Sequence, residues 1–463
     1  MIDRYIIITA FILLGLIGCV VTIFKPRISL KFLIVFSLLI VGPIQFFIPE
    51  LTYLRWTTQL LGIFLVCLGF ILIPVHKPTF VPTSIKFIGL FLLCMIVSVL
   101  INGNYTDFVY DTKNYIAFLC IPLLSLTIAD DDFPDFIFKF YEILAIVQVP
   151  FAVVQYFFFN KVSMHMPGDI VSGTFGGVKQ GLGGPNSELS IFMMCYIFFI
   201  LLRWVYGNAG IVKTTLLVLY SSIPILLSHS KAIVLFIFVS YLVLLPIFFS
   251  KKKIQTIAVS IMLFLFLTAV GLYHYNSRWS YTSKEFVAKD FSSYVDQSIG
   301  YNLESKNKRE LTRLTALSFW FDNHDFSLNP IETLLGHGVG SSKITGVHIG
   351  SLVTSGEFKG YTLSITSCPK LLWEIGMVGT FCFIFIFVST FIASIKVARR
   401  TSNTDLKCFS YICMLFSVIS IIMLFYRNSF FSTQAFSALT MVHIGFVTSQ
   451  SAWKPSKEYE SNV

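Results

Sequence analysis

The sequence predicts an all-α protein that crosses a membrane many times. Hydrophobic residues make up 55% of its 463 residues, charged residues only 13%, and the mean hydropathy is +0.78. Soluble domains carry about 25% charged residues, so this composition excludes a soluble globular protein. Apolar runs of about 20 residues, the length that a helix needs to cross a bilayer, recur along the whole chain. We therefore predict one helical membrane domain over residues 1–463.

Thirteen apolar runs are long enough to be transmembrane helices. The first has full length and no cleavage-site pattern, so we expect it to be retained rather than removed as a signal peptide. The segments between the runs are short, except for a first outer loop at 160–186 and a large outer loop at 276–368. In chain order the predicted spans are 5–24, 29–48, 56–74, 84–101, 113–129, 135–159, 187–206, 213–228, 231–249, 254–275, 369–394, 408–426 and 430–449.

The Lys and Arg residues of the short loops indicate the orientation of the spans. Seventeen of them fall on one side and seven on the other, and the richer side is expected to face the cytoplasm. This places the N-terminus and both longer loops outside and the C-terminus in the cytoplasm. The net charge of +10 follows mostly from this anchoring, so a nucleic-acid partner is not expected.

A polar turn with the sequence SHSK, residues 228–231, separates two of the predicted spans. Lys231 is costly so close to the hydrocarbon core unless it snorkels or has an anionic partner. Three further cations of the predicted outer face, Lys179, Arg313 and Arg427, come from other segments. Together these four cations would suit a diphosphate-linked lipid, because phosphates near a low-dielectric medium need several donors.

The first outer loop has six glycines around Lys179 in VSGTFGGVKQGLGGPNSELS. Their backbone N–H groups allow close approach to a ligand, although a flexible turn gives the same composition. The spacing matches neither a P-loop nor a dinucleotide fingerprint. Pro185, Asn186 and Ser187 then predict a helix start with Glu188 in the first turn, where an acidic side chain favours the positive end of the helix.

The large outer loop contains NLESKNKRELTRLTALSFWF, which predicts a basic amphipathic helix. Lys306, Arg309 and Arg313 share one face of this helix. The apolar face that is expected to be buried consists of Leu311, Leu314, Leu317 and Phe321. Such a helix suits a membrane surface with its cations toward phosphate, and a solvated helix packed on the bundle is the alternative. A second glycine-rich turn, LLGHGVGSS, follows at 334–342.

Two acidic residues lie inside predicted spans, Glu142 near the inner side and Glu374 near the outer side. An ionisable group in the membrane costs about 2.5 to 3.5 kcal/mol on insertion scales, which makes both residues candidates for a functional role. His337 and His348 have no zinc-ligand spacing with each other or with an acidic pair, so no metal site is expected.

Five short segments resemble motifs of one membrane-protein family. SHSKAIVLFIFV resembles an S-x-S-[RK]-[TA] motif that opens a span, and GTFGGVKQGLGGPN is similar to a glycine-rich outer loop before a central span. RLTALSFWF, LLGHGVGSS and LLWEIGMVGTFCFIFIF resemble, in order, an R-x-x-x-W-like helix, a G-x-G-x-G-S turn and an L-x-E-x-G-x-x-G span start. These are motifs of Wzy-type O-antigen polymerases and the related O-antigen ligases, and the resemblance covers roughly residues 170–395.

The resemblance implies a GT-C-like helical fold and a glycosyltransferase that needs neither a metal nor another cofactor. Such enzymes join undecaprenyl-diphosphate-linked oligosaccharide repeat units into O-antigen or capsular polysaccharide at the outer face of the bacterial inner membrane. Carried over by position, Lys231 and Arg313 would hold the donor's diphosphate and make it a better leaving group. Membrane lipids, a chain-length regulator and a flippase would be its other partners.

A histidine that the ligases carry before the L-x-E-x-G motif is absent from LSITSCPKLLWEIG. This absence favours a polymerase over a ligase that transfers polysaccharide to lipid A core. A lipid-linked oligosaccharide flippase or exporter is the non-enzymatic alternative, although it should carry buried charges along a path from both sides. The base that activates the acceptor stays open among Glu188, Glu374 and His348. Further substrate contacts are expected from Lys179, Arg309, Arg427, His337 and Ser230.

Overall fold

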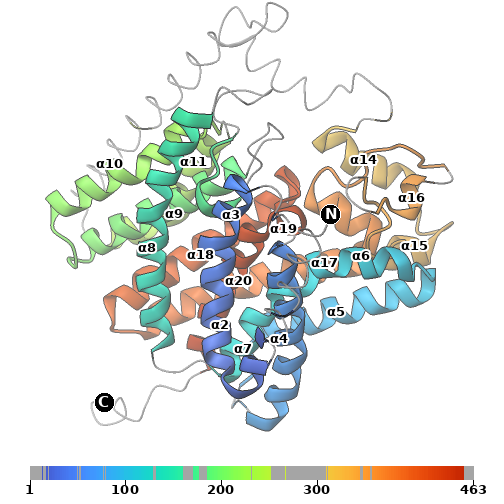
Figure 1. The fold of residues 1–463 in the computed structure, drawn as a ribbon, viewed down its shortest axis with the longest axis horizontal. Helices are drawn as coiled ribbons and strands as arrows, with labels where there is room; N and C mark the ends of the chain where they lie inside the picture. Colours follow the sequence, from blue (N-terminus) through green and yellow to red (C-terminus); the bar gives the residue numbers. More distant parts are fainter. Residues whose placement is uncertain are drawn as a thin grey trace, which may run out of the picture.

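The structure, a computed structural model, consists of helices joined by turns and loops (Figure 1). No strand occurs in the part of the chain that it describes, which is therefore all-α as predicted. Two predicted spans, 5–24 and 254–275, lie largely outside this part. The described residues are 20–48, 54–76, 80–128, 132–159, 170–176, 185–230, 232–251, 311–344, 348–354 and 357–452, and the single residues 13, 17, 18, 51, 78, 266 and 309.

Within these residues, seven helical segments are long and apolar enough to cross a membrane. A chain with so many apolar helices is a polytopic membrane protein. The total of thirteen spans and the GT-C-like fold stay predictions. The seven segments are Pro26–Phe47, Leu54–Pro74, Thr83–Asn102, Phe133–Phe159, Asn186–Val205, Ser367–Arg400 and Thr404–Tyr426, and two shorter apolar helices cover Ile211–Leu227 and Ile233–Phe249.

The helices follow one another with mostly short connections, and α2, α7 and α8 continue into or from π- or 3-10-helical turns. In chain order they are α2 (Pro26–Val35), η1 (Phe36–Ile40), α3 (Val41–Phe47), α4 (Leu54–His76), α5 (Thr83–Asn102), α6 (Tyr105–Ile116), η3 (Ala117–Leu119), α7 (Cys120–Thr127), α8 (Phe133–Val154), η4 (Gln155–Phe159), η6 (Gly173–Phe175), α9 (Asn186–Val205), α10 (Ile211–Leu227), α11 (Ile233–Lys251), α14 (Arg313–Asn323), α15 (Pro330–Leu335), α16 (Ser351–Thr354), α17 (Ser367–Arg400), α18 (Thr404–Tyr426), α19 (Ser429–Ser432) and α20 (Gln434–Ala452).

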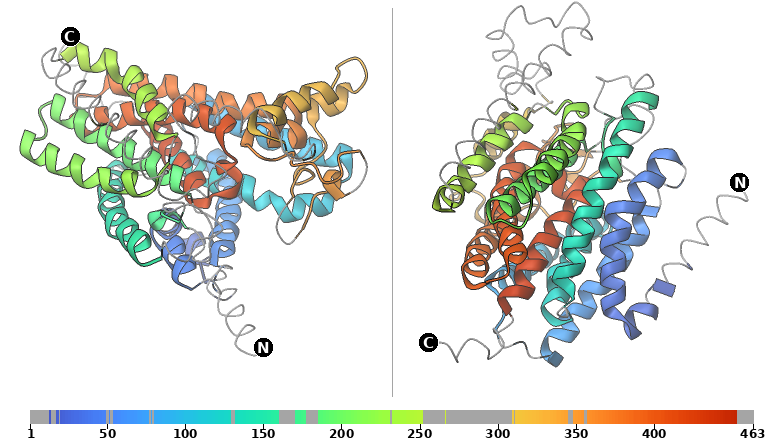
Figure 2. Two further views of the ribbon diagram at one scale, coloured as in Figure 1. Left: turned by 90° about the horizontal axis from the view of Figure 1, so that it is seen from above. Right: turned by 90° about the vertical axis from the view of Figure 1, so that its left-hand side faces the viewer.

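Helix α9 is the most enclosed of the long apolar helices, because 89% of its apolar window is buried inside the protein. It packs against α8, α10, α11 and α18. Helices α2, α8 and α20 run nearly parallel to one another (Figure 2). An apolar helix that is buried on all sides is a core helix, so the side chains at its start are held in a fixed environment.

Ion pairs join the last turn of α9 to the middle of α8 and to the first turn of α18. Arg203, in the last turn of α9, pairs with Glu142 of α8 and lies 2.9 Å from Asp405 Oδ1 in the first turn of α18. Glu142, a functional candidate on sequence grounds, is thus held in a structural ion pair. The opposite ends of α9 and α18 also meet, through Asn186 and Arg427, as antiparallel neighbours must.

The long helix α17 is broken at Gly376, whose φ of 71° is open to glycine but strained for other residues. The break frees the backbone carbonyls of Trp373 and Glu374. They accept the N–H groups of His337 and Gly338 instead, at 2.8 and 3.0 Å. A Cβ on Gly376 would come within 2.4 Å of backbone atoms at the end of α15. The motifs LLGHGVGSS and LLWEIGMVG therefore pack as one unit.

Helix α14 begins at Arg313, later than the sequence pattern predicts. Thr312 is its N-cap and forms a capping box with Thr315, in which each hydroxyl accepts the other residue's backbone N–H. Arg309 precedes the helix, so the prediction that it shares a helical face with Arg313 is wrong. Lys306 lies outside the described residues.

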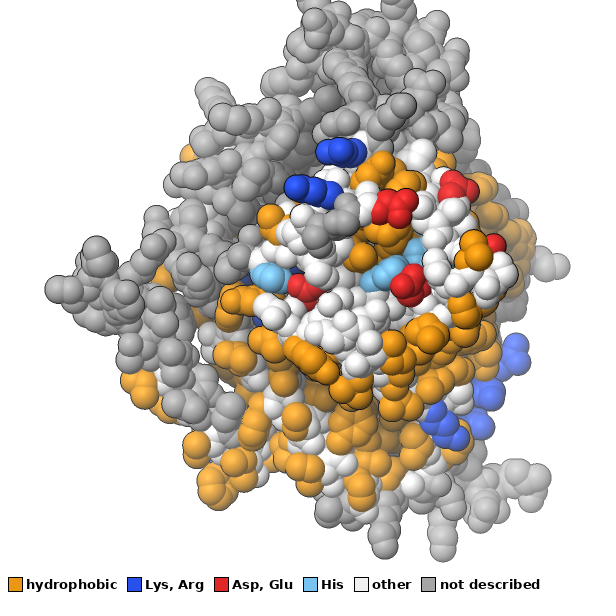
Figure 3. All heavy atoms as spheres, turned by 90° about the vertical axis from the view of Figure 1, so that its right-hand side faces the viewer, with side chains coloured by type: hydrophobic (Ala, Val, Ile, Leu, Met, Phe, Trp, Pro, Cys, Tyr) orange, Lys and Arg blue, Asp and Glu red, His pale blue; other side chains and the backbone are white. Residues whose placement is uncertain are grey.

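The buried face of α14 also differs from the predicted one. Ala316 and Trp320 are buried, whereas Leu314 and Phe321 are more than half exposed. Together with α15 and α16, this helix lies beside α5 and α6 at one end of the molecule (Figure 1). Charged and polar side chains gather on this end, and apolar side chains cover the surface below them (Figure 3). Such a boundary is typical of the place where a membrane protein meets water.

Candidate functional site

Glu188 is a fully buried acidic residue at the start of α9. The helix begins at Asn186 after Pro185, as predicted, and this puts Glu188 in the first turn. Its carboxylate accepts hydrogen bonds from Ser429 Oγ and, at 3.3 Å, from Arg427 Nη1. The positive end of the α9 dipole adds to this stabilisation. Glu188 is therefore held between a helix N-terminus and an arginine.

Arg427 lies in the turn after α18 and contacts the first turn of α9. Its Nη1 lies 3.3 Å from Asn186 Oδ1 and 3.3 Å from Glu188 Oε2. The Arg427 side chain is nevertheless 37% exposed, so it is accessible to a ligand. Its backbone carbonyl accepts a hydrogen bond from Ser367 Oγ at 3.1 Å, which brings the start of α17 to the same turn.

The polar turn between α10 and α11 packs on the same helix start. The Ser228 carbonyl accepts a hydrogen bond from Asn186 Nδ2 at 3.1 Å. Ser230 Oγ donates to Ser187 Oγ at 3.2 Å. Between these serines, His229 has a φ of 51°, a left-handed conformation that few residues other than glycine adopt. The turn is thus fixed against α9 by hydrogen bonds on both sides of the histidine.

Arg313, the first residue of α14, reaches the end of α18. Its guanidinium carbon lies 4.3 Å from the centre of the Tyr426 ring. Tyr426 is the last residue of α18, and Arg427 follows it directly. Two arginines that are distant in the sequence, Arg313 and Arg427, therefore both lie at the end of α18.

We call Arg313, Tyr426, Arg427 and Glu188 the arginine site. The structure brings together three residues that the sequence analysis singled out, Arg313, Arg427 and Glu188, and places Ser230 against the same first turn of α9. Lys179 and Lys231, the other two expected cations, lie outside the described residues. Arg309 is exposed, and its backbone carbonyl accepts the Thr362 N–H at 3.1 Å.

Glu374 belongs to a second, buried cluster in which both carboxylate oxygens have two partners. With four donors around it and no exposed surface, Glu374 anchors the glycine-rich turn on α17. This geometry favours a structural role over that of a catalytic base. Oε2 accepts hydrogen bonds from Tyr115 Oη at 2.5 Å and Gly340 N at 2.7 Å, and Oε1 accepts one from Ser342 Oγ at 2.6 Å and lies 3.1 Å from Lys370 Nζ.

Asp111 of α6 continues this ion cluster. Its Oδ2 lies 2.6 Å from Lys370 Nζ, and its Oδ1 lies 3.0 Å from Lys343 Nζ. Burial alone would raise the pKa of Asp111, but the two ammonium groups hold that pKa below its ordinary value. Oδ1 also accepts a hydrogen bond from Asn114 Nδ2 at 2.6 Å. The cluster therefore joins α6, the glycine-rich turn and α17.

His337 and His348, the two histidines that the sequence analysis singled out, contact residues outside the arginine site. His337 Nε2 lies 3.1 Å from His324 Nε2, and burial lowers the pKa of both residues to about 4. Both are therefore neutral near pH 7. His348 pairs through Nε2 with Asp107 of α6. These contacts tie the large outer loop to itself and to α6.

Sequence reasoning missed Lys370, Asp111 and Tyr426. Lys370 stands four residues before Glu374, a spacing that puts both side chains on one face of a helix, so this signal was present in the sequence. Asp111 and Tyr426 have partners that are far away in the sequence, and no local pattern indicates them.

Comparison with protein-family models finds no match, and comparison with curated proteins finds none either. In the described part of the chain, no group of three or more His, Cys, Asp or Glu side chains is placed to hold a metal ion. Fold and site together define a polytopic helical membrane protein with a buried ion cluster and an accessible arginine site where several of its helices end.

Proposed function

We propose that the protein joins undecaprenyl-diphosphate-linked oligosaccharide repeat units into O-antigen or capsular polysaccharide. The arginine site is the observation that supports this most. Arg313 over Tyr426 and Arg427 beside Glu188 put two guanidinium groups at the end of apolar helices. This suits a ligand with two phosphates and a lipid tail, because guanidinium groups bind phosphate oxygens in pairs while the tail stays in the bilayer.

In the proposed reaction the diphosphate is the leaving group. A hydroxyl oxygen of the acceptor glycan bonds to the anomeric carbon of the donor and releases its proton to solvent water, while the bond from that carbon to the diphosphate oxygen breaks. Undecaprenyl diphosphate leaves with the negative charge that develops on this oxygen. Arg313 and Arg427 offset that charge more strongly in the transition state than in the ground state, which lowers the barrier.

Glu188 has a positioning role in this proposal. It is fully buried behind Arg427, which is the more accessible partner of the pair. A carboxylate 3.3 Å from the guanidinium fixes the direction in which the remaining N–H groups point. Glu188 thus acts on the donor through Arg427. This differs from the role of acceptor-activating base for which the sequence made it a candidate.

The proposal places the arginine site at the outer face of the bacterial inner membrane, with the N-terminus outside and the C-terminus in the cytoplasm. Support comes from the two ends of the bundle. Arg203, Arg399 and Arg400 lie at the ends of α9 and α17 that are opposite the arginine site. Such an excess of basic residues is typical of the cytoplasmic side.

The test is polymerisation by the purified protein in liposomes that contain undecaprenyl-diphosphate-linked repeat units, with product ladders resolved on a gel. Arg427→Ala should reduce the rate about a hundredfold, as removal of one oxyanion donor does. Arg427→Lys should also fall, because an ammonium cannot form the paired hydrogen bonds of a guanidinium. Arg400→Ala, an exposed arginine at the other end of α17, is the matched control and should stay within about twofold.

Other products would assign other functions. Transfer of finished polysaccharide to lipid A core without a ladder would indicate a ligase. Movement of the lipid-linked oligosaccharide across the bilayer without a new glycosidic bond would indicate a flippase. A full ladder made by Arg427→Ala would contradict the proposal itself.

A further inference from the structure

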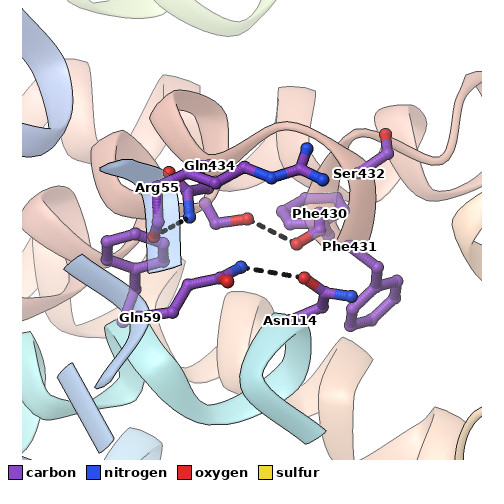
Figure 4. A pocket seen from close by; sticks show the side chains of 9 residues that line it. Arg55, Gln59, Asn114, Phe430, Phe431, Ser432 and Gln434 are labelled. Carbon is purple, nitrogen blue, oxygen red and sulfur yellow. Dashed lines mark hydrogen bonds between the residues drawn. The ribbon is translucent and has the colours of Figure 1, made fainter. Parts of the chain in front are cut away.

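The polar pocket between α4, α6 and the turn before α20 is closed to larger ligands (Figure 4). Gln59 Nε2 donates to Asn114 Oδ1 at 2.9 Å, and Gln434 Nε2 donates to the Arg55 carbonyl at 2.8 Å. The pocket has a volume of about 20 Å³, which holds about one water molecule. A further partner would therefore contact the exposed surface of the protein rather than this pocket.

The segment 326–334, which leads into α15 and through most of it, exposes apolar side chains on that surface. Four of its nine residues are large and apolar, and none of the four is buried. Single exposed apolar residues are common on proteins, but several in one short segment indicate a contact surface. Ile331 and Leu334 are three residues apart in α15 and so share one helical face. The exposed fractions are 55% for Phe326, 77% for Leu328, 56% for Ile331 and 38% for Leu334.

The backbone of the turn before α15 is hydrogen-bonded within itself. The Asp325 carboxylate accepts the Ser327 N–H at 2.8 Å. The Asp325 carbonyl accepts the N–H groups of Leu328 and Asn329 at 3.2 and 2.8 Å. Pro330, the first residue of α15, has no N–H group. The turn can therefore enter an apolar environment without leaving these donors unpaired.

The end of α15 lies against the end of α5, a helix that is long and apolar enough to cross a membrane. Asn102, the last residue of α5, donates through Nδ2 to the Gly336 carbonyl at 2.9 Å. Gly336 is the C-cap of α15. Just beyond, Asn104 Nδ2 donates to the His337 carbonyl at 2.7 Å. The two helices therefore meet where the apolar run of α5 ends.

One face of α5 is apolar and exposed as far as this junction. Its exposed side chains are three or four residues apart, which places them on one side of the helix. In a helix that crosses a membrane, such a stripe contacts lipid. The stripe reaches the last turn of α5, the same turn that contacts the end of α15. It consists of Leu90, Leu93, Ile96 and Leu100.

We propose that residues 326–334 insert their apolar side chains into the lipid leaflet at this end of the protein, at the boundary between headgroups and acyl chains. The bilayer is the occupant that the observations favour, because α5 brings this boundary to the end of α15. Burial of apolar surface drives the contact. Asp325 and Glu332, which are not buried, keep the segment at the boundary and out of the hydrocarbon core. The inference does not depend on the proposed function.

The experiment measures the depth of a nitroxide label on the full-length protein in liposomes of phosphatidylethanolamine and phosphatidylglycerol. The label is attached at Leu328→Cys, in a variant in which the exposed Cys67 and any other reactive cysteine are replaced by serine. Its collision rates with oxygen and with a water-soluble nickel chelate report the depth. The label should lie about 5 to 10 Å below the lipid phosphates, the depth of apolar segments at a membrane interface.

Three further labels make the measurement interpretable. Ile331→Cys should lie in the same range of about 5 to 10 Å, so the result does not depend on one substitution. Leu93→Cys, in the stripe of α5, should lie deeper, because that helix crosses the bilayer. Lys359→Cys, at an exposed lysine of the same region, should stay in water.

Three results would overturn the inference. Equal access of the nickel chelate to the labels at 328 and 359 would mean that the apolar surface faces water. A label at 328 that neither collision partner reaches would mean that another part of the chain, a second copy or a protein partner covers it. Loss of insertion when phosphatidylcholine replaces phosphatidylglycerol would mean that charge, rather than apolar contact, holds the segment. No repeat-unit substrate is present, so the ladder assay with Arg427 variants tests the proposed function separately.

Discussion

The guanidinium carbon of Arg313 lies 4.3 Å from the centre of the Tyr426 ring, so the first residue of α14 is held over the last residue of α18. The contact connects the segment predicted as the large outer loop, 276–368, to a helix that is long and apolar enough to cross a membrane. A cation over an aromatic face is attracted by about 0.5 to 2 kcal/mol, which is enough to select one side-chain orientation.

The first prediction concerns the ring of Tyr426. Tyr426→Phe keeps the aromatic face and should polymerise within about twofold of the unaltered protein. Tyr426→Leu loses the cation–π attraction, so Arg313 is no longer held in one orientation and the rate should fall between about twofold and thirtyfold. The ladder assay in liposomes measures both. Equal rates for the Phe and Leu variants would show that the ring does not orient Arg313.

The second prediction concerns Lys370, which bridges the buried carboxylates of Asp111 and Glu374. Lys370→Met leaves unpaired charge in a buried cluster, so the free energy of unfolding should fall by about 3 to 5 kcal/mol. Lys359→Met removes an exposed lysine of the same outer region and should change it by no more than about 0.5 kcal/mol. Chemical unfolding of the purified protein in detergent measures both changes.

A second substitution tests the cause of that loss. Glu374→Gln in the Lys370→Met background removes one of the two carboxylates that the first change leaves without the lysine. Part of the lost stability should return, because a neutral amide costs less to bury than a charge. If the double variant were less stable than Lys370→Met, packing rather than charge would explain the effect.

The third prediction is a loss of local stability in acid around His324 and His337. Burial lowers the pKa of each from 6.5 to about 4, so between these values the unfolded segment binds protons that the folded segment excludes. Stability is therefore fully present above pH 6.5 and declines as the pH falls toward 4. Hydrogen exchange of residues 324–340, corrected for its intrinsic pH dependence, should show more frequent opening at pH 5 than at pH 7. In the variant with His324→Gln and His337→Gln the difference between the two pH values should disappear, and an unchanged difference would exclude these histidines as its cause.

Local features of the sequence predicted much of the fold. The apolar runs of 84–101 and 187–206 coincide closely with α5 and α9. Pro134 in the first turn of α8 and Asn186 at the start of α9 mark helix starts, because such residues favour the backbone at a helix N-terminus. These signals act over a few residues and are readable without the rest of the chain.

Contacts between distant segments were not predictable in the same way. The start of α14 was misjudged because the spacing of Arg309 and Arg313 continues a helical pattern, whereas the Thr312 capping box ends it. Asp111 has a local Asn114 partner, but its lysines are Lys343, which directly follows the glycine-rich turn, and Lys370 of α17.

The fourth prediction concerns orientation. Reporter fusions after Arg400 should report the cytoplasm, and fusions within 280–360 should report the outer compartment, because Arg203, Arg399 and Arg400 lie at the ends of α9 and α17 opposite the arginine site. A single cysteine in place of Ser432, in a variant without other reactive cysteines, should react with a membrane-impermeant maleimide added from outside. A cytoplasmic signal from a fusion at residue 320 would contradict both the orientation and the proposed site.

The last prediction compares Arg313 with Arg309. If the segment only rests on the membrane surface, each arginine contributes a similar electrostatic term of about 1 kcal/mol, and neutralising either should matter equally little. Their structural positions are unequal, however. Arg313 is the first residue of α14 and lies over Tyr426, so a phosphate bound by it would also lie near the positive end of that helix, whereas Arg309 sits in the exposed turn before the cap.

This inequality gives the two variants different expected rates. Arg313→Ala and Arg313→Lys should both polymerise about a hundredfold more slowly or worse, because they lose paired hydrogen bonds that strengthen as the diphosphate departs. Arg309→Ala should stay within about threefold of the unaltered protein, the effect of one exposed charge. Rates in the liposome assay, at matched protein amounts and with unchanged thermal unfolding, make the comparison. Equal, modest losses at the two positions would contradict a catalytic role for Arg313 and leave α14 as a surface anchor.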